Sequence, residues 1–230
     1  NPGVYNAGFV GSDTTSGALS GEGARSMVFD GINDLSVTFN ESIYLEQSGG
    51  VSIWFSPDTM GDIPGYSLFT TSGGVEGHNL SLSNNGLLLY GTTSQQIYNP
   101  GFSYDLLNGF NHVVMNWSQT DVEGTYFYNY TIYVNGTKVV DNQLVVGTNQ
   151  SASFFDTRIG GSDAWVNQPF KGLIDDVRLA QYGFTEQQVT DLFNGVQVSN
   201  NETRVIYTFN NDANGATQII DSSPVYETPS

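Results

Sequence analysis

The sequence is dominated by short segments in which apolar and polar residues alternate, each closed by residues that favour turns. The clearest segments carry Leu35, Val37 and Phe39, then Val51, Ile53 and Phe55, then Val113, Met115 and Trp117. A period of two is typical of half-buried β-strands, because successive side chains point to opposite faces of a sheet. The pattern predicts strands at residues 26–30, 35–39, 51–56, 110–117, 126–134, 172–179 and 204–209.

The longest alternating run, residues 126–134, is followed by Asn135-Gly136 and another apolar stretch. Asn and Gly both tolerate the positive φ angles of a type I′ turn, so this segment predicts a β-hairpin. Aromatic residues occur on both faces of residues 126–130. We therefore expect part of this strand to be exposed or covered by a partner.

One short helix is predicted after Thr185. Gln188 stands where a capping box needs it, and Val189, Leu192 and Phe193 share one helical face. A single helix among many strands predicts an all-β fold, a two-sheet antiparallel jelly-roll sandwich. At 230 residues, the chain fits one domain spanning residues 1–230.

The charge balance restricts the class of partner. Acidic residues outnumber basic ones by 23 to 6, for a net charge of −17, and such a field repels phosphate backbones. We therefore expect no nucleic-acid partner. No apolar stretch is long enough to cross a bilayer, so we also expect no direct membrane insertion. Cysteine is absent, which excludes disulfides and leaves calcium as a candidate stabilising element.

Four stretches carry recognisable motifs in a fixed order along the chain. They are residues 26–34 with Phe-Asp-Gly, residues 51–58 ending in Pro-Asp, residues 111–117 with the hairpin at 130–136, and residues 170–179 with Phe-Lys-Gly-Leu-Ile-Asp-Asp-Val-Arg-Leu. Together they resemble the laminin-G-like, concanavalin A-like jelly rolls, which include pentraxin-like lectins. The resemblance implies the fold but not one function, because the family includes lectins, receptor-binding modules, adhesins and glycosidase appendages.

One departure from this family concerns the first strand. The apolar strand and Asp-Ser-Ser segment that open its members are found here at the C-terminus, in residues 205–212 and 219–223. We therefore predict that residues 204–221 are a displaced first strand, which completes its own or a neighbouring domain. A circular permutation, one phase of a tandem array or head-to-tail strand donation would each produce this order.

The sequence offers little support for catalysis. The Glu-x-Asp-x-x-Glu pattern of related glycosidases is absent. Asp175 and Asp176 are adjacent, so a regular strand would point them to opposite faces. His78 and His112 lie far apart in sequence, and the resemblance assigns His112 to a structural strand. We therefore expect a protein that is not an enzyme.

Carboxylates near the predicted turns are candidate calcium ligands, because calcium prefers hard oxygens. The candidates are Asp30, Asp34, Asp175, Asp212 and Asp221. Asp175 has the strand parity of Leu173, Val177 and Leu179, which predicts a carboxylate on the core face that needs a cation or several N–H donors. The alternative is that Asp30 and Asp175 only accept hydrogen bonds from backbone N–H groups.

A polar loop that contains one aromatic residue is the candidate ligand site. Trp165 lies in residues 162–168 with Asp163, Asn167 and Gln168, which suits stacking on a sugar and bonding to its hydroxyl groups. The alternative is that Trp165 folds back as a lid over the sandwich edge. Trp54 and Trp117 lie within predicted strands and are assigned to the core.

Seven Asn-x-Ser/Thr sequons point to export to a glycosylating surface, although a polar β-protein also acquires such sequons by chance. They begin at Asn40, Asn79, Asn116, Asn129, Asn135, Asn149 and Asn201.

These features favour a non-catalytic extracellular module at a cell or virion surface. The first hypothesis is a structural building block or adhesin of a surface filament or virion appendage, with a glycan or surface protein as partner. The alternative is a monomeric calcium-dependent carbohydrate-binding (lectin) domain. A glycoside hydrolase-related enzyme ranks third.

Overall fold

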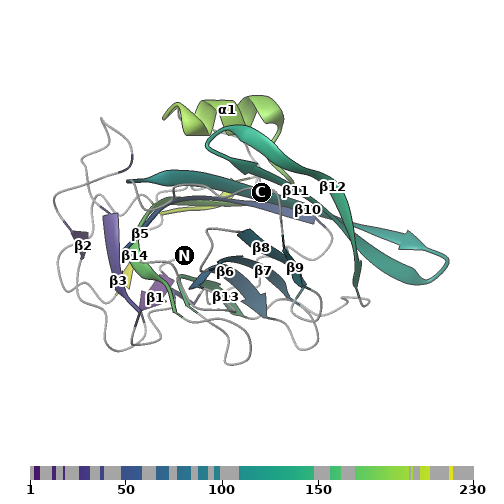
Figure 1. Ribbon diagram of the computed structural model, residues 1–230, viewed down its shortest axis with the longest axis horizontal. Helices are drawn as coiled ribbons and strands as arrows, with labels where there is room; N and C mark the ends of the chain where they lie inside the picture. The colour runs from purple at the N-terminus through teal and green to yellow at the C-terminus, as the bar shows by residue number, and fades with distance from the viewer. Residues whose placement is uncertain are drawn as a thin grey trace, which may run out of the picture.

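The structure is a computed structural model, and the description covers residues 3–5, 12–13, 18, 26–31, 37–38, 48–58, 66–72, 77–83, 88–92, 96–98, 109–147, 156–161, 169–196, 198, 203–207 and 218–219. Two antiparallel sheets pack face to face, and a helix covers the outer face of the larger one (Figure 1). This is the predicted all-β, two-sheet jelly-roll sandwich.

Among the described residues, the larger sheet has eight strands, seven of which follow the order β12, β11, β10, β5, β14, β3, β2, while β15 also pairs with β14. Their bounds are β2 (Ser12–Asp13), β3 (Ser26–Asp30), β5 (Ser48–Pro57), β10 (Asn111–Val122), β11 (Thr125–Val134), β12 (Thr137–Gly147), β14 (Lys171–Ala180) and β15 (Thr203–Tyr207). The strands predicted at 26–30, 51–56, 110–117, 126–134 and 172–179 are confirmed, and most of them extend a few residues further.

The smaller sheet has five strands in the order β13, β6, β7, β8, β9. They are β6 (Tyr66–Ser72), β7 (His78–Leu82), β8 (Leu88–Thr92), β9 (Gln96–Tyr98) and β13 (Asp156–Ile159). A third sheet joins β16 (Gln218–Ile219), β1 (Gly3–Tyr5) and β4 (Val37–Thr38). β4 is the described part of the strand predicted at 35–39.

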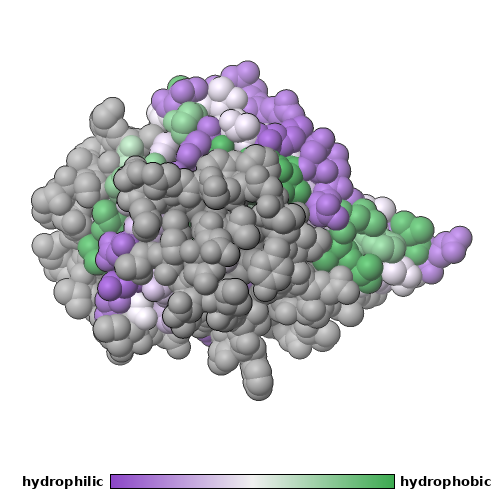
Figure 2. All heavy atoms as spheres, viewed as in Figure 1, coloured by the Kyte–Doolittle hydropathy of each residue, from purple (hydrophilic) through white to green (hydrophobic). Residues whose placement is uncertain are grey.

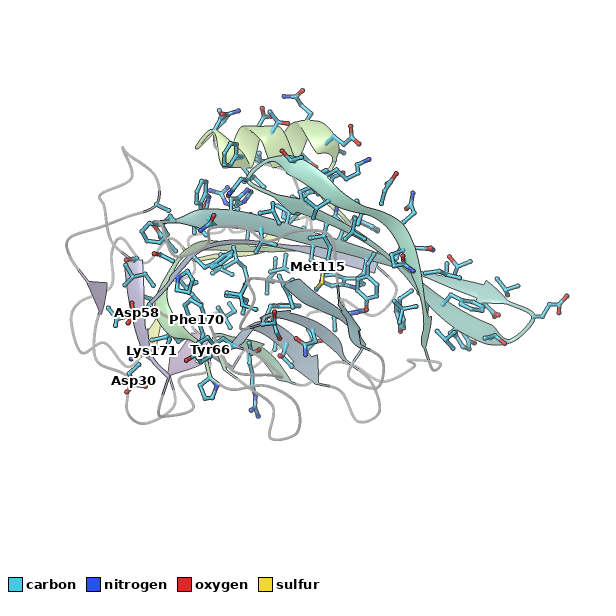
Figure 3. All side chains as sticks on the ribbon, in the orientation of Figure 1. Asp30, Asp58, Tyr66, Met115, Phe170 and Lys171 are labelled. Atoms are coloured by element: carbon cyan, nitrogen blue, oxygen red, sulfur yellow. The ribbon has the colours of Figure 1, made fainter. Side chains whose placement is uncertain are left out.

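The core lies between the two large sheets and follows the predicted alternation. Within residues 51–55 of β5 and 113–117 of β10, every second residue faces the smaller sheet, and the exposed fraction of these side chains does not exceed 2%: Val51, Ile53, Phe55, Val113, Met115 and Trp117. They pack with the apolar side chains of the smaller sheet, such as Leu68 and Leu80. Figure 3 shows the Met115 side chain in this central position. Burial of this apolar surface is the main contribution to folding.

The hairpin between β11 and β12 has the predicted turn. Asn135 and Gly136 have φ angles of 48° and 76°, and Val134 lies opposite Thr137. The Asn135 side chain also accepts a hydrogen bond from the His112 N–H at 2.8 Å, which ties the turn to β10. The positive φ values explain why Asn-Gly occupies this position.

Helix α1 (Glu186–Phe193) begins with the predicted capping box. The Thr185 hydroxyl accepts the Gln188 N–H at 3.2 Å, and the Gln188 side chain accepts the Thr185 N–H at 2.8 Å. Val189 and Leu192 are buried against the outer face of the larger sheet. At eight residues α1 is too short to cross a membrane, and the described part of the chain holds no helix that could.

The C-terminal segment adds strands to its own chain. β15 pairs with residues 177–180 of β14, and β3 pairs with residues 171–174 along the same side of β14. β3 and β15 therefore share one edge of β14, on either side of residues 175–176. β16 pairs with β1, which places residues 218–219 beside residues 3–4. The strand predicted at 204–209 is thus present as Thr203–Tyr207.

Gly172 lies where β14 pairs with the end of β5, and there is no space for a side chain at this position. Its φ is +140°, and a Cβ atom would lie 2.2 Å from the Ser56 carbonyl oxygen. We expect Gly172→Ala to lower the free energy of unfolding by about 2–3 kcal/mol, because both the backbone strain and the clash involve main-chain atoms. Chemical denaturation measures the effect. Gly109→Ala is the control, since Gly109 has a φ of +93° and no atom within 4 Å of the added carbon. Equal losses in the two variants would show that the clash is absent.

Candidate functional site

The loop predicted to bind a ligand starts and ends at one edge of the sandwich. Its residues Asp163, Trp165, Asn167 and Gln168 lie outside the described residues. The two ends of the loop meet, because the Phe170 N–H donates to the Gly160 carbonyl at 2.8 Å. The buried Phe170 ring makes edge-on contacts with Phe29 and Tyr66, at centroid distances of 6.1 and 6.3 Å. The base of the loop is therefore held firmly in the core.

Four polar or aromatic residues lie on the strands and strand ends that flank this base, and they are here called the loop-edge cluster: Asp30, Asp58, Tyr66 and Lys171. Asp30 lies directly opposite Lys171 across β3 and β14, and the Asp58 N–H donates to the Lys171 carbonyl at 3.1 Å. Asp58 is exposed, and the other three are half-buried. Figure 3 shows all four on the same side of the molecule. Carboxylates, an ammonium group and an aromatic ring on neighbouring segments suit a polar ligand that also has apolar faces.

The prediction that Asp175 faces the core is wrong. A β-bulge interrupts the pairing of β14 with β5 between residues 175 and 178, and Asp176 has a φ of +39°. The extra residue reverses the alternation. Val177 and Leu179 are therefore in the core, whereas Leu173 and Asp175 belong to the outer face of the sheet.

Asp175 instead serves as a hydrogen-bond acceptor for the backbone. Its two carboxylate oxygens accept the N–H groups of Ala18 and Asp176, both at 2.8 Å. This is the alternative interpretation of Asp175 given by the sequence, and it fixes the segment at Ala18 to β14. Such bonds satisfy a buried carboxylate without a cation.

The described residues do not form a calcium site by themselves. Asp30 pairs with Lys171, four residues before Asp175 on β14, so the two candidates are about 13 Å apart along the strand. Among the described residues, no three His, Cys, Asp or Glu side chains gather around a common point. Asp34, Asp212 and Asp221 lie outside the described residues. Calcium binding therefore stays a prediction.

Asp176 forms a buried ion pair on the outer side of the larger sheet. Its carboxylate accepts the Arg178 Nε–H and Nη2–H groups at distances of 2.9 to 3.1 Å, and both side chains are 2% exposed. A regular strand would point Asp175 and Asp176 to opposite faces, but the bulge turns Asp176 toward Arg178. Asp175 and Asp176 are thus both buried and engaged with groups of the protein.

The two histidines are buried on opposite sides of the larger sheet, His112 on its strand β10 and His78 on β7 of the smaller sheet. His112 stacks on Trp54 at 4.9 Å beneath α1, and its Nε2 atom is 2.8 Å from the Ser52 hydroxyl oxygen. His78 lies in the core, with Nδ1 2.7 Å from the Tyr130 hydroxyl oxygen. Burial lowers the pKa of each to about 3. Both imidazoles are therefore neutral at pH 7 and have structural positions.

Three of the four described sequons are occupied by structural contacts. Asn79 is 2% exposed, which leaves no room for a glycan in the folded chain. The Asn116 amide binds the Phe184 N–H and carbonyl groups, and the Asn135 amide binds Asn111 and the His112 N–H. Glycosylation at these three positions is therefore incompatible with the fold. Asn129 is half-exposed and bonds only to the Thr120 hydroxyl at 3.2 Å in the described contacts. The sequons at Asn40, Asn149 and Asn201 lie outside the described residues.

The motifs and the two-sheet architecture define a laminin-G-like jelly roll. A laminin-G domain model described as the concanavalin A-like lectin/glucanases superfamily matches residues 30–190. The chain belongs to this superfamily, as its motifs predicted. No curated protein matches the chain.

Several solved structures are similar in fold. Domain 4 of AbnA, an extracellular arabinanase of Geobacillus stearothermophilus solved with arabinotriose, is 21% identical, with a TM-score of 0.55 over 81% of this chain and 82% of that one. A putative carbohydrate-binding protein from Bacteroides ovatus is 18% identical, with a TM-score of 0.53 over 96% of this chain and 55% of that one. Tailspike protein 2 of Escherichia coli O157:H7 bacteriophage CAB120 is 12% identical, with a TM-score of 0.53 over 91% of this chain and 30% of that one. At these sequence identities, the similarity shows a shared fold alone.

Proposed function

We propose that the chain is a non-catalytic carbohydrate-binding module that acts outside the cell. The observation that carries this proposal is the loop-edge cluster, which combines carboxylates, a lysine and a half-buried tyrosine at the base of the loop that holds Trp165. Aromatic rings stack on sugar C–H surfaces, and polar groups bind sugar hydroxyls. The similar domain solved with arabinotriose supports the same class of ligand.

Binding is favoured over glycoside hydrolysis because of the state of the carboxylates. Hydrolysis needs an acid and a second carboxylate on either side of the scissile bond. On β14, Asp175 is bonded to two N–H groups and Asp176 is paired with Arg178.

The filament or virion-appendage hypothesis ranks second. It depended on a C-terminal strand entering a neighbouring copy, whereas β15 pairs with β14 of its own chain. That pairing occupies the edge of β14 beside β3, where a donated strand would have to bind. A module that attaches to glycans from a cell or virion surface remains compatible with this arrangement, and an adhesin would use the same site.

A direct test measures binding and turnover on the same preparation. We expect the full chain to bind at least one oligosaccharide on a glycan array that includes arabinotriose, without releasing reducing ends from the matching polysaccharide. Binding should weaken in Trp165→Ala if the loop contributes. Repeating the assay in excess chelator tests calcium binding. A calcium-binding chain should bind glycan more weakly in the chelator and have a lower melting temperature. Absence of glycan binding with and without added calcium would contradict the proposal, and release of reducing ends would make the chain an enzyme.

A further inference from the structure

The hairpin of β10 and β11 leaves the sandwich near its tip. Trp117 is the last fully buried inward-facing residue of β10, and the next two, Gln119 and Asp121, are half-buried and exposed. On β11, Tyr128 is buried whereas Tyr126 is half-buried. Figure 1 shows this hairpin, together with part of β12, projecting beyond the smaller sheet. The side of the hairpin that faces the core at Trp117 and Tyr128 therefore extends beyond the core, and we call it the inner face of the hairpin.

Three residues on this inner face form what we call the hairpin shelf: Gln119, Asp121 and Tyr126. Asp121 lies directly opposite Tyr126, and Gln119 lies opposite Tyr128 on the same face. On the other side Tyr126 faces Gly147, which has no side chain to cover the ring. The shelf thus presents an accessible aromatic ring with a carboxylate and an amide beside it.

The polar groups of the shelf are held in place. The Asp121 carboxylate accepts the Gly124 N–H at 2.8 Å, which fixes it within the turn of the hairpin. The Gln119 amide donates to the Tyr128 hydroxyl at 3.2 Å. Each group keeps further hydrogen-bonding capacity, because a carboxylate has about four acceptor sites and an amide two donors and an acceptor. Groups positioned in advance lose less entropy when a ligand binds.

We propose that the hairpin shelf is a glycan-binding site for neutral oligosaccharides, separate from the loop-edge cluster. The Tyr126 ring stacks on the apolar face of a sugar, and Asp121 and Gln119 bind its hydroxyl groups. This proposal rests on the carbohydrate-binding function proposed above and assigns a location and a ligand class to it.

The charge around the shelf selects against acidic sugars. Residues 118–130 and 143–147 contain Asp121 and Glu123 but no Lys or Arg, within a chain of net charge −17. A sialic acid or uronic acid carboxylate would therefore meet only negative charge here. A neutral sugar meets no such repulsion.

The outer face of the same hairpin provides the control. Phe127 follows Tyr126 and points to the opposite face, where Val122, Leu144 and Val146 are 52%, 49% and 46% exposed. Figure 2 shows hydrophobic residues on the projecting hairpin beside a hydrophilic tip. That face has exposed apolar surface without the carboxylate and amide of the shelf. Phe127→Ala therefore removes an aromatic ring from the same strand without altering the shelf.

The experiment compares Tyr126→Ala, Gly147→Val and Phe127→Ala with the unmodified full chain on immobilised neutral oligosaccharides, including arabinotriose, and on 3′-sialyllactose. Tyr126→Ala removes the stacking ring. Gly147→Val leaves the ring but covers it, and valine suits a strand position, so this variant tests the site even if Tyr126→Ala folds poorly. We expect at least tenfold weaker binding of neutral sugars in both variants, unchanged binding in Phe127→Ala, and no binding of 3′-sialyllactose at the shelf.

The outcomes separate this inference from the function proposed above. If the unmodified chain binds neutral sugar, and Tyr126→Ala and Gly147→Val bind it equally well, the shelf is not the site and the carbohydrate-binding function stands. Loss of binding in Trp165→Ala alone would assign the site to the loop. If no sugar binds the unmodified chain, both proposals fail. Binding to 3′-sialyllactose that depends on Tyr126 would overturn the neutral class.

Discussion

Replacing Arg178 by methionine is expected to lower the free energy of unfolding by about 3–5 kcal/mol. The substitution keeps much of the side-chain volume but removes the positive charge, so the Asp176 carboxylate stays buried without its ion-pair partner. Both side chains are 2% exposed, and water cannot replace the lost bonds. Chemical denaturation followed by tryptophan fluorescence measures the effect, because Trp54 and Trp117 are buried in the folded chain.

Two comparisons establish that the loss comes from an unpaired buried charge. Lys138→Met removes ion pairs with Asp141 and Glu186 that are largely exposed, and it should change stability little. Adding Asp176→Asn to Arg178→Met removes both charges, and asparagine tolerates the positive φ at this position. The double variant should be more stable than Arg178→Met alone. If it is equally unstable or worse, the side-chain volume of Arg178 rather than its charge decides the loss.

The buried ion pair also shows where prediction from sequence ends. Alternation predicted the strand at 172–179, but it assumed a regular strand throughout. The bulge at Asp176 reverses the alternation midway, so Leu173 and Val177 face opposite sides although four residues separate them. The bulge lies where the partner of β14 along one edge changes from β3 to β15, and these two segments are far apart in sequence.

Local signals predicted the turns and the helix well. The Asn135-Gly136 turn and the capping box of Thr185 and Gln188 depend on residues within a few positions of one another, and both are present. Burial was predicted better than the side of the sheet on which a residue lies. Trp54 was assigned to the core and is 6% exposed, but it is buried under α1 on the outer face, where it stacks on Phe193 at 5.8 Å. The helix that buries it follows more than 130 residues later.

The candidate sites show the same limit. The sequence indicated that aromatic residues occupy both faces of residues 126–130, and it left their exposure open. The structure places Tyr128 in the core and Tyr126 beyond it, because the smaller sheet ends before the hairpin does. The length of one sheet relative to the other is a tertiary property that alternation within one strand does not contain. The loop-edge cluster likewise joins residues from β3, β6 and β14 with Asp58, which directly follows β5.

Acidification is expected to destabilise the chain through His78 and His112. Their pKa values are lowered to about 3 in the folded chain, in both cases mainly by burial, and for His112 also by the Arg178 charge. In the unfolded chain both would titrate near 6.5. Between these values the unfolded chain binds more protons than the folded chain. The stabilising contribution is therefore complete above about pH 6.5 and is lost progressively as the pH falls toward 3.

Other groups oppose this trend, so the test must isolate each histidine. Burial raises the pKa of Asp176 despite the nearby Arg178, and a raised carboxyl pKa favours the folded chain in acid. Protonation of surface carboxylates also relieves the repulsion within a chain of net charge −17. The measured change in the free energy of unfolding with pH is, for the unmodified chain, the sum of these effects. Comparing it with a variant that lacks one histidine cancels the contributions that the two proteins share.

His112→Gln serves this purpose, because glutamine does not titrate and can still bond to the Ser52 hydroxyl that lies 2.8 Å from His112 Nε2. Between about pH 7 and about pH 4.5, the unmodified chain should lose about 3 kcal/mol more stability than the variant, from two pH units of differential protonation. His78→Gln should give a difference of the same sign. Urea denaturation at both pH values measures the four free energies required for each comparison. If the His112→Gln difference is the same at both pH values, His112 is already protonated in the folded chain or remains accessible to water, and the assignment of a buried neutral imidazole beneath α1 is wrong.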